Sequence, residues 1–329
     1  MTDTLLAAYD AVLFDLDGTV YHGTQVIPGA PETVKAARDH GTPVRFVTNN
    51  ASKAPAEVVE HLVGLGMPAD TDEVHTSSQA AVVLLRERLE PGAEVLVVGT
   101  ESLAAEVGQA GLKPVRANAE SVQAVVQGHS PDNTWAALAE ACLAIRAGAL
   151  WVACNVDATL PSERGLLPGN GSMVAALRTA TDAEPLVAGK PEPLLFETAA
   201  KSAGAEHPLV VGDRLDTDIA GAVAAGIDSL VVLSGVATPE QLVKAIPAER
   251  GTYLAADLTA LTSTLEELKI GPRPGWSADA GDDAVVVTGD GDDLDLLRAL
   301  CHAAWESGKT TVQGDGEAAK AALARLGLV

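Results

Sequence analysis

An α/β fold with a parallel sheet is predicted for this chain of 329 residues. Short apolar segments rich in β-branched residues alternate with longer Ala-rich segments of helical spacing, which is the pattern of strand–helix–strand units. Polar residues directly follow several of the apolar segments, as expected where parallel strands end at a ligand site. The length suits two domains of roughly 100–200 residues each.

The predicted strands are short and are bounded by Gly, Asp or Asn, and right-handed helical crossovers connect them. Strands are expected at Ala11–Phe14, Pro43–Val47, Glu94–Val98, Ala124–Gln127, Leu150–Ala153, Leu209–Val211 and Ser229–Leu233. Helices are expected at Ala30–His40, Pro55–Leu65, Ser78–Leu89, Trp135–Ala147, Gly171–Thr181, Pro193–Ala203 and Asp216–Ala225.

The C-terminal part of the chain follows a Pro- and Gly-rich segment, Gly271–Gly281, which is typical of a linker. The part of the chain beyond this linker is too small to form a hydrophobic core of its own. We therefore expect it to dock on the main body or on another subunit. Its elements are expected to be a strand at Ala284–Thr288, a helix at Asp292–Glu306, a strand at Thr310–Val312 and a helix at Glu317–Leu326.

Gln313–Ala318, inside this extension, loosely fits the Q-x-x-G-x-A pattern with which acetyltransferases hold the pyrophosphate of coenzyme A. The acidic Asp315 and Glu317 would repel a pyrophosphate, and the segment is too short for a complete acetyltransferase. We expect a structural or interaction segment here, with coenzyme A binding as an alternative.

The composition excludes several classes of function. Lys and Arg number 22 against 45 Asp and Glu, a net charge of −23, which opposes binding to nucleic acid or to an anionic membrane. Three scattered cysteines support neither a disulfide framework nor a structural zinc site. The N-terminus lacks the basic region of a signal peptide, and no apolar stretch is long enough to span a membrane, so we expect a cytoplasmic protein.

Two aspartates, Asp15 and Asp17, follow the first predicted strand in the sequence Asp-Leu-Asp-Gly-Thr. A carboxylate can attack phosphorus when a metal ion screens the charge repulsion, and a second carboxyl nearby can donate a proton to the leaving oxygen. Two further strand ends carry polar groups: Thr48 and Asn49 after the second strand, and Asp213 after Leu209–Val211.

These residues resemble the four motifs of the haloacid dehalogenase (HAD) superfamily, in the correct order. Asp15–Thr19 resembles motif one, Thr48 in VTNN motif two, Lys190 in GKPEP motif three, and Gly212–Asp218 motif four. The resemblance implies a Rossmann-like parallel-sheet HAD core and a phosphohydrolase, because dehalogenases of the superfamily lack the second aspartate.

The resemblance also implies the roles of the site residues. Asp15 resembles the nucleophile, and Asp17 the general acid and base. Thr48, Asn49 and Lys190 would bind the phosphate group. The implied Mg²⁺ ligands are Asp15, the backbone carbonyl of Asp17, Asp213 and Asp218. An all-oxygen set of ligands suits this ion, and such a cluster of carboxylates repels itself without a cation.

The 142 positions between Thr48 and Lys190 far exceed one crossover, so we expect an inserted α/β domain there. This layout resembles the C2-capped, type IIA branch of the superfamily. Core residues are expected at 1–79 and 185–268, the C2 cap domain at 80–184, and a small α/β C-terminal extension at 269–329. A cap excludes water and contacts the leaving group. The candidates for that contact are Asp157, Asn170, Gly171 and Ser172.

The layout of the whole chain resembles actinobacterial glycerol 3-phosphate phosphatases, which carry an extra C-terminal segment. A small phosphorylated metabolite is therefore the expected substrate, with glycerol 3-phosphate the best single choice. Phosphoglycolate, pyridoxal phosphate and a nucleoside monophosphate remain alternatives, as does a regulatory or scaffold role without catalysis. The branch allows a homodimer, although no residue here establishes one.

Overall fold

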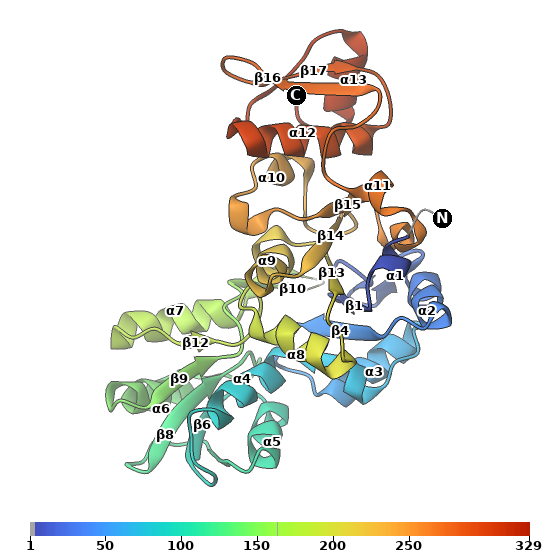
Figure 1. The fold of residues 1–329 in the computed structure, drawn as a ribbon. Coiled ribbons are helices and arrows are strands. Elements are labelled where there is room, and N and C mark those ends of the chain that lie inside the picture. The colour runs from blue at the N-terminus through green and yellow to red at the C-terminus, as the bar shows by residue number, and fades with distance from the viewer. Residues whose placement is uncertain (1–3, 163) are drawn as a thin grey trace. The chain divides into compact units, whose positions relative to one another are not determined.

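The computed structural model describes residues 4–162 and 164–329 (Figure 1). The chain forms two compact units, one made of residues 1–45 and 200–329 and the other of residues 46–199. Each is an α/β unit with its own sheet. The boundaries predicted for the core, the cap and the extension stay predictions.

Four parallel strands of the first unit lie side by side in the order β15 (Tyr253–Ala255), β14 (Asp228–Val232), β13 (Pro208–Gly212) and β1 (Ala11–Phe14). Every residue of β1 and β13 is buried, as the continuous apolar run of each strand predicts for the centre of a parallel sheet. Val12 of β1 donates its N–H to the carbonyl of Pro43, just before β4 (Val44–Thr48) begins. The carboxyl ends of β1 and β13 therefore meet at one edge.

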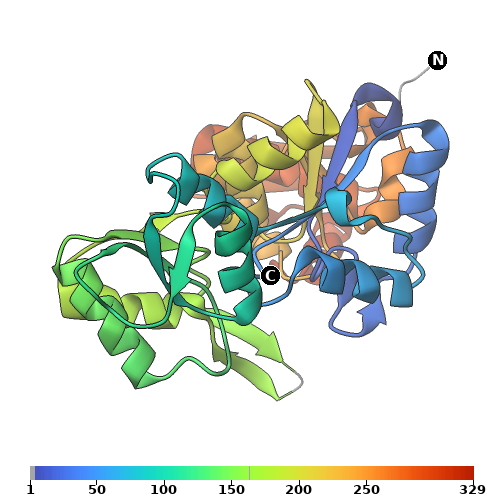
Figure 2. The ribbon, with the colours of Figure 1, turned by 90° about the horizontal axis from the view of Figure 1, so that it is seen from below.

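The second unit has a five-stranded parallel sheet in the order β12 (Leu186–Val187), β9 (Leu150–Ala153), β8 (Val122–Gln127), β6 (Glu94–Val98) and β7 (Lys113–Val115). Helices α6 and α7 cover one face through an apolar cluster that includes Ile145, Trp151 and Leu177, and α4 and α5 lie on the other (Figure 1). A hairpin of β10 (Thr159–Ser162) and β11 (Gly165–Pro168) projects from this unit (Figure 2). In the same unit, β5 (Val74–Thr76) pairs in parallel with the end of β4.

The remaining elements are mostly helices. The α-helices are α1 (Leu5–Ala8), α2 (Ala30–His40), α3 (Pro55–Gly64), α4 (Ser77–Arg86), α5 (Glu101–Gln109), α6 (Trp135–Arg146), α7 (Asn170–Thr181), α8 (Leu194–Ala203), α9 (Ala220–Ala225), α10 (Pro239–Val243), α11 (Leu265–Leu268), α12 (Asp293–Ser307) and α13 (Glu317–Arg325). Short 3₁₀ turns lie at Thr71–Glu73, Pro247–Glu249 and Leu258–Thr262, and a small hairpin joins β2 (Tyr21–His22) to β3 (Gln25–Val26). None of the helices described is both long and apolar enough to cross a membrane.

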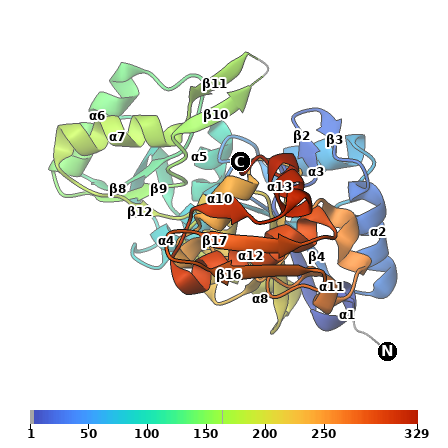
Figure 3. The same ribbon diagram turned by 90° about the horizontal axis from the view of Figure 1, so that it is seen from above.

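The C-terminal extension is part of the first unit and packs on its main sheet, as predicted. Its sheet, in the order β16 (Trp276–Ala280), β17 (Val285–Gly289) and β18 (Val312–Gly314), lies across α12 (Figure 3). Leu297 and Leu300 of α12 join one apolar cluster with Val231 and Leu254 from the main sheet. The extension thus shares its hydrophobic core with the main sheet.

The linker predicted at Gly271–Gly281 is wrong in part, because Trp276–Ala280 forms β16, antiparallel to β17. Trp276 is buried and anchors the strand, while the glycines around it supply the turns; Gly275, at φ +85°, adopts the left-handed conformation. The helix expected at Asp216–Ala225 also differs at its start, since Leu215–Ile219 is a π-helical turn that leads into α9.

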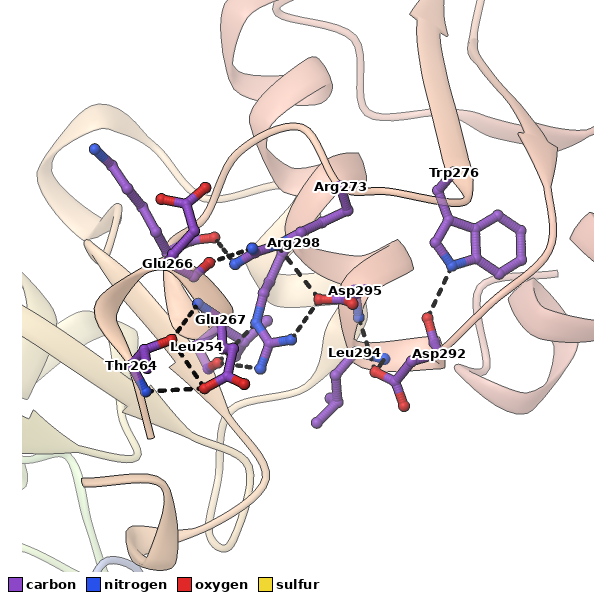
Figure 4. A network of polar contacts seen from close by, with 11 residues as sticks. Leu254, Thr264, Glu266, Glu267, Arg273, Trp276, Asp292, Leu294, Asp295 and Arg298 are labelled. Atoms are coloured by element: carbon purple, nitrogen blue, oxygen red, sulfur yellow. Dashed lines mark hydrogen bonds and ion pairs between the residues drawn. The ribbon is translucent and has the colours of Figure 1, made fainter. Parts of the chain in front are cut away.

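The buried side chain of Arg298 connects α12 to β15 by hydrogen bonds (Figure 4). Arg298 donates hydrogen bonds of 3.0 and 2.7 Å to the carbonyl of Leu254 and pairs with Asp295 at 2.8 Å. Asp295 also lies 3.3 Å from Nε of Arg273, whose Nη atoms donate to the carbonyls of Glu266 and Lys269. Arg298 thus satisfies a carbonyl of β15 where α12 packs on the strand, and Arg273 binds two carbonyls in the segment of α11.

Arg298→Ala is expected to lower the free energy of unfolding by about 2–4 kcal/mol, because it leaves the buried Leu254 carbonyl and one side of Asp295 without a donor. Urea denaturation followed by tryptophan fluorescence measures this. Arg325→Ala is the matched control in the same extension: its pair with Asp293 is exposed, so the loss should stay below about 1 kcal/mol. Equal losses for the two variants would contradict the role given to Arg298.

Candidate active site

Three aspartates meet at the carboxyl ends of β1 and β13. Asp15, Asp213 and Asp218 each offer one carboxylate oxygen, and these oxygens all lie within 4.8 Å of one another. The three residues are at most 8% exposed, so water screens their mutual repulsion poorly. Carboxylate oxygens at this spacing in a buried position suit a hard divalent cation such as Mg²⁺.

The local backbone explains why these side chains converge. Asp15 directly follows β1 and donates its N–H to the carbonyl of Val211 in β13, which fixes its register at the sheet edge. Asp213 directly follows β13. Asp218 lies in the π-helical turn, where its carboxylate accepts the N–H of Arg214 at 3.0 Å and so turns back toward the strand end.

Three glycines clear the space around these carboxylates. A Cβ atom at Gly18 or Gly235 would lie 2.3 or 1.9 Å from Asp213 Oδ2, and one at Gly212 would lie 2.3 Å from Cβ of Asp218. The backbone therefore packs directly on the side chains of Asp213 and Asp218. The residues present fit the Mg²⁺ that the HAD motifs imply.

Asp17 differs from the other aspartates because its side chain is exposed. It lies in the turn that follows β1, and its carboxylate lies 3.9 Å from Nδ1 of His22. His22 Nε2 in turn lies 2.8 Å from the carbonyl oxygen of Ser234. An exposed carboxyl in this turn suits contact with a substrate, and the metal-ligand role expected for the backbone carbonyl of Asp17 stays a prediction.

In the second unit, Lys190 and Thr48 are both buried. Lys190 Nζ donates to the carbonyl of Val47 at 3.3 Å and lies 5.9 Å from the ring centre of Phe196. The Thr48 hydroxyl accepts the N–H of Asn50 at 3.1 Å. Lys190 is only 2% exposed, and because lysines are rarely buried without specific partners, it differs from an ordinary solvated surface lysine.

The Asn49 side chain connects the predicted phosphate-binding and cap residues. Its oxygen accepts the N–H of Lys190 at 2.7 Å, and its nitrogen donates to the Lys190 carbonyl at 3.0 Å and to both carboxylate oxygens of Asp157 at 3.3 Å. The amide of Asn49 is thus used to position Lys190 and Asp157.

The other cap candidates brace the loop that carries Asp157. Asn170 is buried and donates to the carbonyls of Gln127 and Asn155, at 3.2 and 2.7 Å. The N–H of Gly171 donates to the carbonyl of Asp157, and the Ser172 hydroxyl donates to the carbonyl of Ala158. The contacts with Asn155, Asp157 and Ala158 fix the backbone of this loop, and the contact with Gln127 ties Asn170 to the end of β8. Binding of a substrate by the cap candidates stays a prediction.

The chain shows clear similarity to known proteins. Residues 12–113 match the family model of haloacid dehalogenase-like hydrolases, and residues 187–261 match a second, HAD-hydrolase-like model. The chain is 50% identical to the D-glycerol 3-phosphate phosphatase of Mycobacterium tuberculosis, over 98% of this chain and 95% of that protein. The chain belongs to the haloacid dehalogenase-like hydrolases.

Other HAD relatives differ in length and in named activity. A 5′-nucleotidase of Bacillus subtilis is 37% identical over 77% of this chain and 98% of its own, and an acid sugar phosphatase of Staphylococcus aureus is 38% identical over 79% and 99%. The crystal structure of a glycerol phosphate phosphatase from M. tuberculosis with magnesium superimposes with a TM-score of 0.96, at 50% identity over both full chains. These matches confirm the predicted family, fold class and phosphatase class.

The extension has a match of its own. Residues 273–328 match a GCN5-related N-acetyltransferase like domain, the kind of fold that the pattern at Gln313–Ala318 suggests. In the structure this pattern joins β18 to α13, and Gly314 lies against the backbone of α13, where a Cβ atom would come within 2.8 Å of the Lys320 nitrogen. The small residue is thus explained by packing of the strand against the helix.

Glu106 of α5, in the unit that carries the cap candidates, has a buried carboxyl group with an altered pKa. Among the described residues neither of its carboxylate oxygens, both buried, has a hydrogen-bond partner. Burial raises the pKa of Glu106 to about 7. Burial, and after it the charge of Glu106, raises the pKa of the Cys154 thiol. Cys154 directly follows β9 and precedes Asn155 and the loop of Asp157.

Stability should therefore depend on pH through Glu106. The carboxyl loses its proton near pH 4.5 in the unfolded chain but near pH 7 in the folded one, so stability falls as the pH rises between these values. Glu106→Gln is expected to stabilise the protein by about 2 kcal/mol at pH 8, a value reduced for partial solvent screening, and by much less at pH 5. Urea denaturation at both pH values measures the difference.

Glu101→Gln is the control, because Glu101 lies on the same helix with an exposed side chain. It should change stability equally little at both pH values. A gain for Glu106→Gln that is the same at pH 5 and pH 8 would contradict the assignment.

Proposed function

We propose that this protein is a Mg²⁺-dependent phosphomonoester hydrolase that converts glycerol 3-phosphate to glycerol and phosphate through an aspartyl-phosphate on Asp15. The buried cluster of Asp15, Asp213 and Asp218 carries this proposal. It is supported by the 50% identity, over nearly the full chain, to a D-glycerol 3-phosphate phosphatase.

The nucleophilic step follows from the carboxylate of Asp15. One of its oxygens attacks phosphorus in line with the leaving alcohol oxygen, and the P–O bond to that oxygen breaks. Bound Mg²⁺ supplies positive charge beside the transferring phosphoryl group. The proposed phosphate ligands are Thr48, Asn49 and Lys190, of which Lys190 contributes a second positive charge. The side-chain amide of Asn49 is engaged in positioning Lys190, so we propose that Asn49 contacts the phosphate group through its backbone.

Proton transfer is assigned to Asp17. In the first step its carboxylic acid gives a proton to the leaving oxygen of glycerol, and it becomes a carboxylate. In the second step that carboxylate takes a proton from the water that attacks phosphorus, which frees phosphate and restores Asp15. The exposed position of Asp17 suits a group that must reach both an alcohol and a water.

The choice of glycerol 3-phosphate over other esters rests on the extension. The relatives named as a 5′-nucleotidase and as acid sugar phosphatases match 77–79% of this chain, whereas the D-glycerol 3-phosphate phosphatase matches 98%. Asp157, with Asn170, Gly171 and Ser172 behind it, is the proposed contact of the cap with the leaving group. We further propose a cytoplasmic location, and a homodimer stays a prediction.

Phosphate release from a panel of esters tests the proposed function. Glycerol 3-phosphate should give the highest kcat/KM, ahead of phosphoglycolate, pyridoxal phosphate and UMP, and EDTA should abolish every rate until Mg²⁺ is restored. A panel dominated by another ester would keep the chemistry and reject the substrate. No hydrolysis of any ester would favour the scaffold role instead.

Asp15→Asn should lower kcat for glycerol 3-phosphate by at least about 1,000-fold, because an amide is a poor nucleophile toward phosphorus. Asp216→Asn is the control, since Asp216 is exposed and pairs with Arg214 rather than with the metal site. Its kcat should stay within about twofold of wild type. An Asp15→Asn enzyme that folds, by circular dichroism, and keeps its activity would disprove the aspartyl-phosphate mechanism.

Asp17→Asn separates acid catalysis from a structural role. It should lower kcat/KM for glycerol 3-phosphate by about 100-fold or more, but for p-nitrophenyl phosphate by less than about 10-fold, because p-nitrophenolate leaves without a proton. Both values report the steps up to the transfer of the phosphoryl group to Asp15. Losses of the same size for the two esters would argue against Asp17 as the general acid.

A further inference from the structure

A loop after β14, Ser234–Ala237, contacts both strand ends that form the metal site; we refer to it as the β14 loop. The N–H of Val236 donates to Asp213 Oδ2 at 2.7 Å, and the N–H of Ala237 donates to the Asp213 carbonyl at 2.8 Å. At its other end, the Ser234 hydroxyl donates to the carbonyl of Gly18 at 2.9 Å. The loop therefore connects the turn after β1 to the carboxylate after β13.

Gly235 brings the β14 loop unusually close to Asp213. A Cβ atom at Gly235 would lie 1.9 Å from Oδ2, 2.4 Å from Cγ and 2.8 Å from Cβ of Asp213, so the clash involves the whole side chain and not its terminal oxygen alone. Gly235 does not have a left-handed φ, so an alanine there is acceptable to the backbone itself. Glycine is needed at this position for the close approach alone.

Asp213 has no room to retreat from a side chain at position 235. The backbone of Gly18 is almost as close, since a Cβ atom there would lie 2.3 Å from the same oxygen and 2.7 Å from Oδ1. The carboxylate is fully buried, and the Thr19 hydroxyl donates to Oδ1 at 3.2 Å. Two glycines thus enclose Asp213, and two donors, Val236 N–H and Thr19 Oγ1, set its rotation.

We propose that Gly235 is a positioning residue of the metal site, which sets both the affinity for Mg²⁺ and the preference for Mg²⁺ over Ca²⁺. This inference rests on the proposed function, since it takes Asp213 as a metal ligand. Donors behind a ligating carboxylate typically control metal affinity by about 10–100-fold. Mg²⁺ requires near-octahedral ligands at short distances, while Ca²⁺ accepts longer and less regular ones, so a displaced Asp213 penalises Mg²⁺ more.

Isothermal titration of Gly235→Ala with MgCl₂ and with CaCl₂, without substrate, tests the proposal. The methyl group must displace either the carboxylate or the exposed β14 loop, and both remove the hydrogen bond from Val236. We expect the Kd for Mg²⁺ to rise at least about 10-fold and the Kd for Ca²⁺ to rise by a clearly smaller factor. General loss of structure would raise both Kd values equally, so the ratio identifies positioning.

Gly271→Ala is the matched control, because a Cβ atom there meets nothing within 4 Å and its φ is not left-handed. Both of its Kd values should equal those of wild type. If Gly235→Ala does not fold, Thr19→Val takes its place, and loss of the Oδ1 donor should raise the Kd for Mg²⁺ by about 3–10-fold.

The possible results separate this inference from the proposed function. If wild type binds Mg²⁺ and Gly235→Ala (or, in its place, Thr19→Val) binds it within twofold of wild type, the positioning role is wrong while the proposed function stands. Equal losses for Mg²⁺ and Ca²⁺ in Gly235→Ala also overturn it. A wild-type protein that binds no Mg²⁺ overturns the proposed function and this inference together.

Discussion

Repulsion among three buried carboxylates is the constraint on which the active site depends. Asp15, Asp213 and Asp218 lie within 4.8 Å of one another with almost no contact with water. Such an arrangement is unfavourable for a folded chain unless a cation or donors compensate it. The backbone around the cluster supplies donors from Arg214 and Val236, and the glycines let it pack closely against the aspartate side chains. A divalent cation held by these carboxylates would also offset the net negative charge of the chain toward a phosphate ester.

In the second unit, Asn49 lies at the centre of a hydrogen-bond network. Its amide fixes the backbone of Lys190 and contacts Asp157, while Asn155 and Ser77 both donate to its own carbonyl, at 2.7 and 2.6 Å. One residue after β4 therefore connects the predicted phosphate lysine with the predicted cap contact.

The central part of the site could be predicted from sequence because it depends on strand order alone. Asp15 and Asp213 each follow a fully apolar strand, and parallel neighbours bring such positions to one edge. The β14 loop was missed, although Ser234 and Gly235 also follow a buried strand; applying the same strand-end rule to β14 would have found them. What no pattern could show is the close approach of Gly235 to Asp213, because it depends on the fold of the loop.

Three other structural features were not predicted from the sequence patterns. Trp276–Ala280 forms a strand, but the prolines and glycines beside it are typical of a linker. Asn49 was expected to bind phosphate, and only the structure shows its amide held by Lys190 and Asp157. The unpaired Glu106 lies on α5, a helix that the pattern did not predict. For Asn49 the deciding contacts join residues more than 100 positions apart in the chain.

The most direct test of the account is to identify the residue that becomes phosphorylated. The protein is mixed with glycerol 3-phosphate and Mg²⁺, quenched within one turnover, reduced with borohydride and mapped by peptide mass spectrometry. The account predicts reduction of Asp15 to homoserine, dependent on Mg²⁺, with Asp17 unchanged. Reduction at Asp17, or continued phosphate release with no aspartate modified, would contradict it.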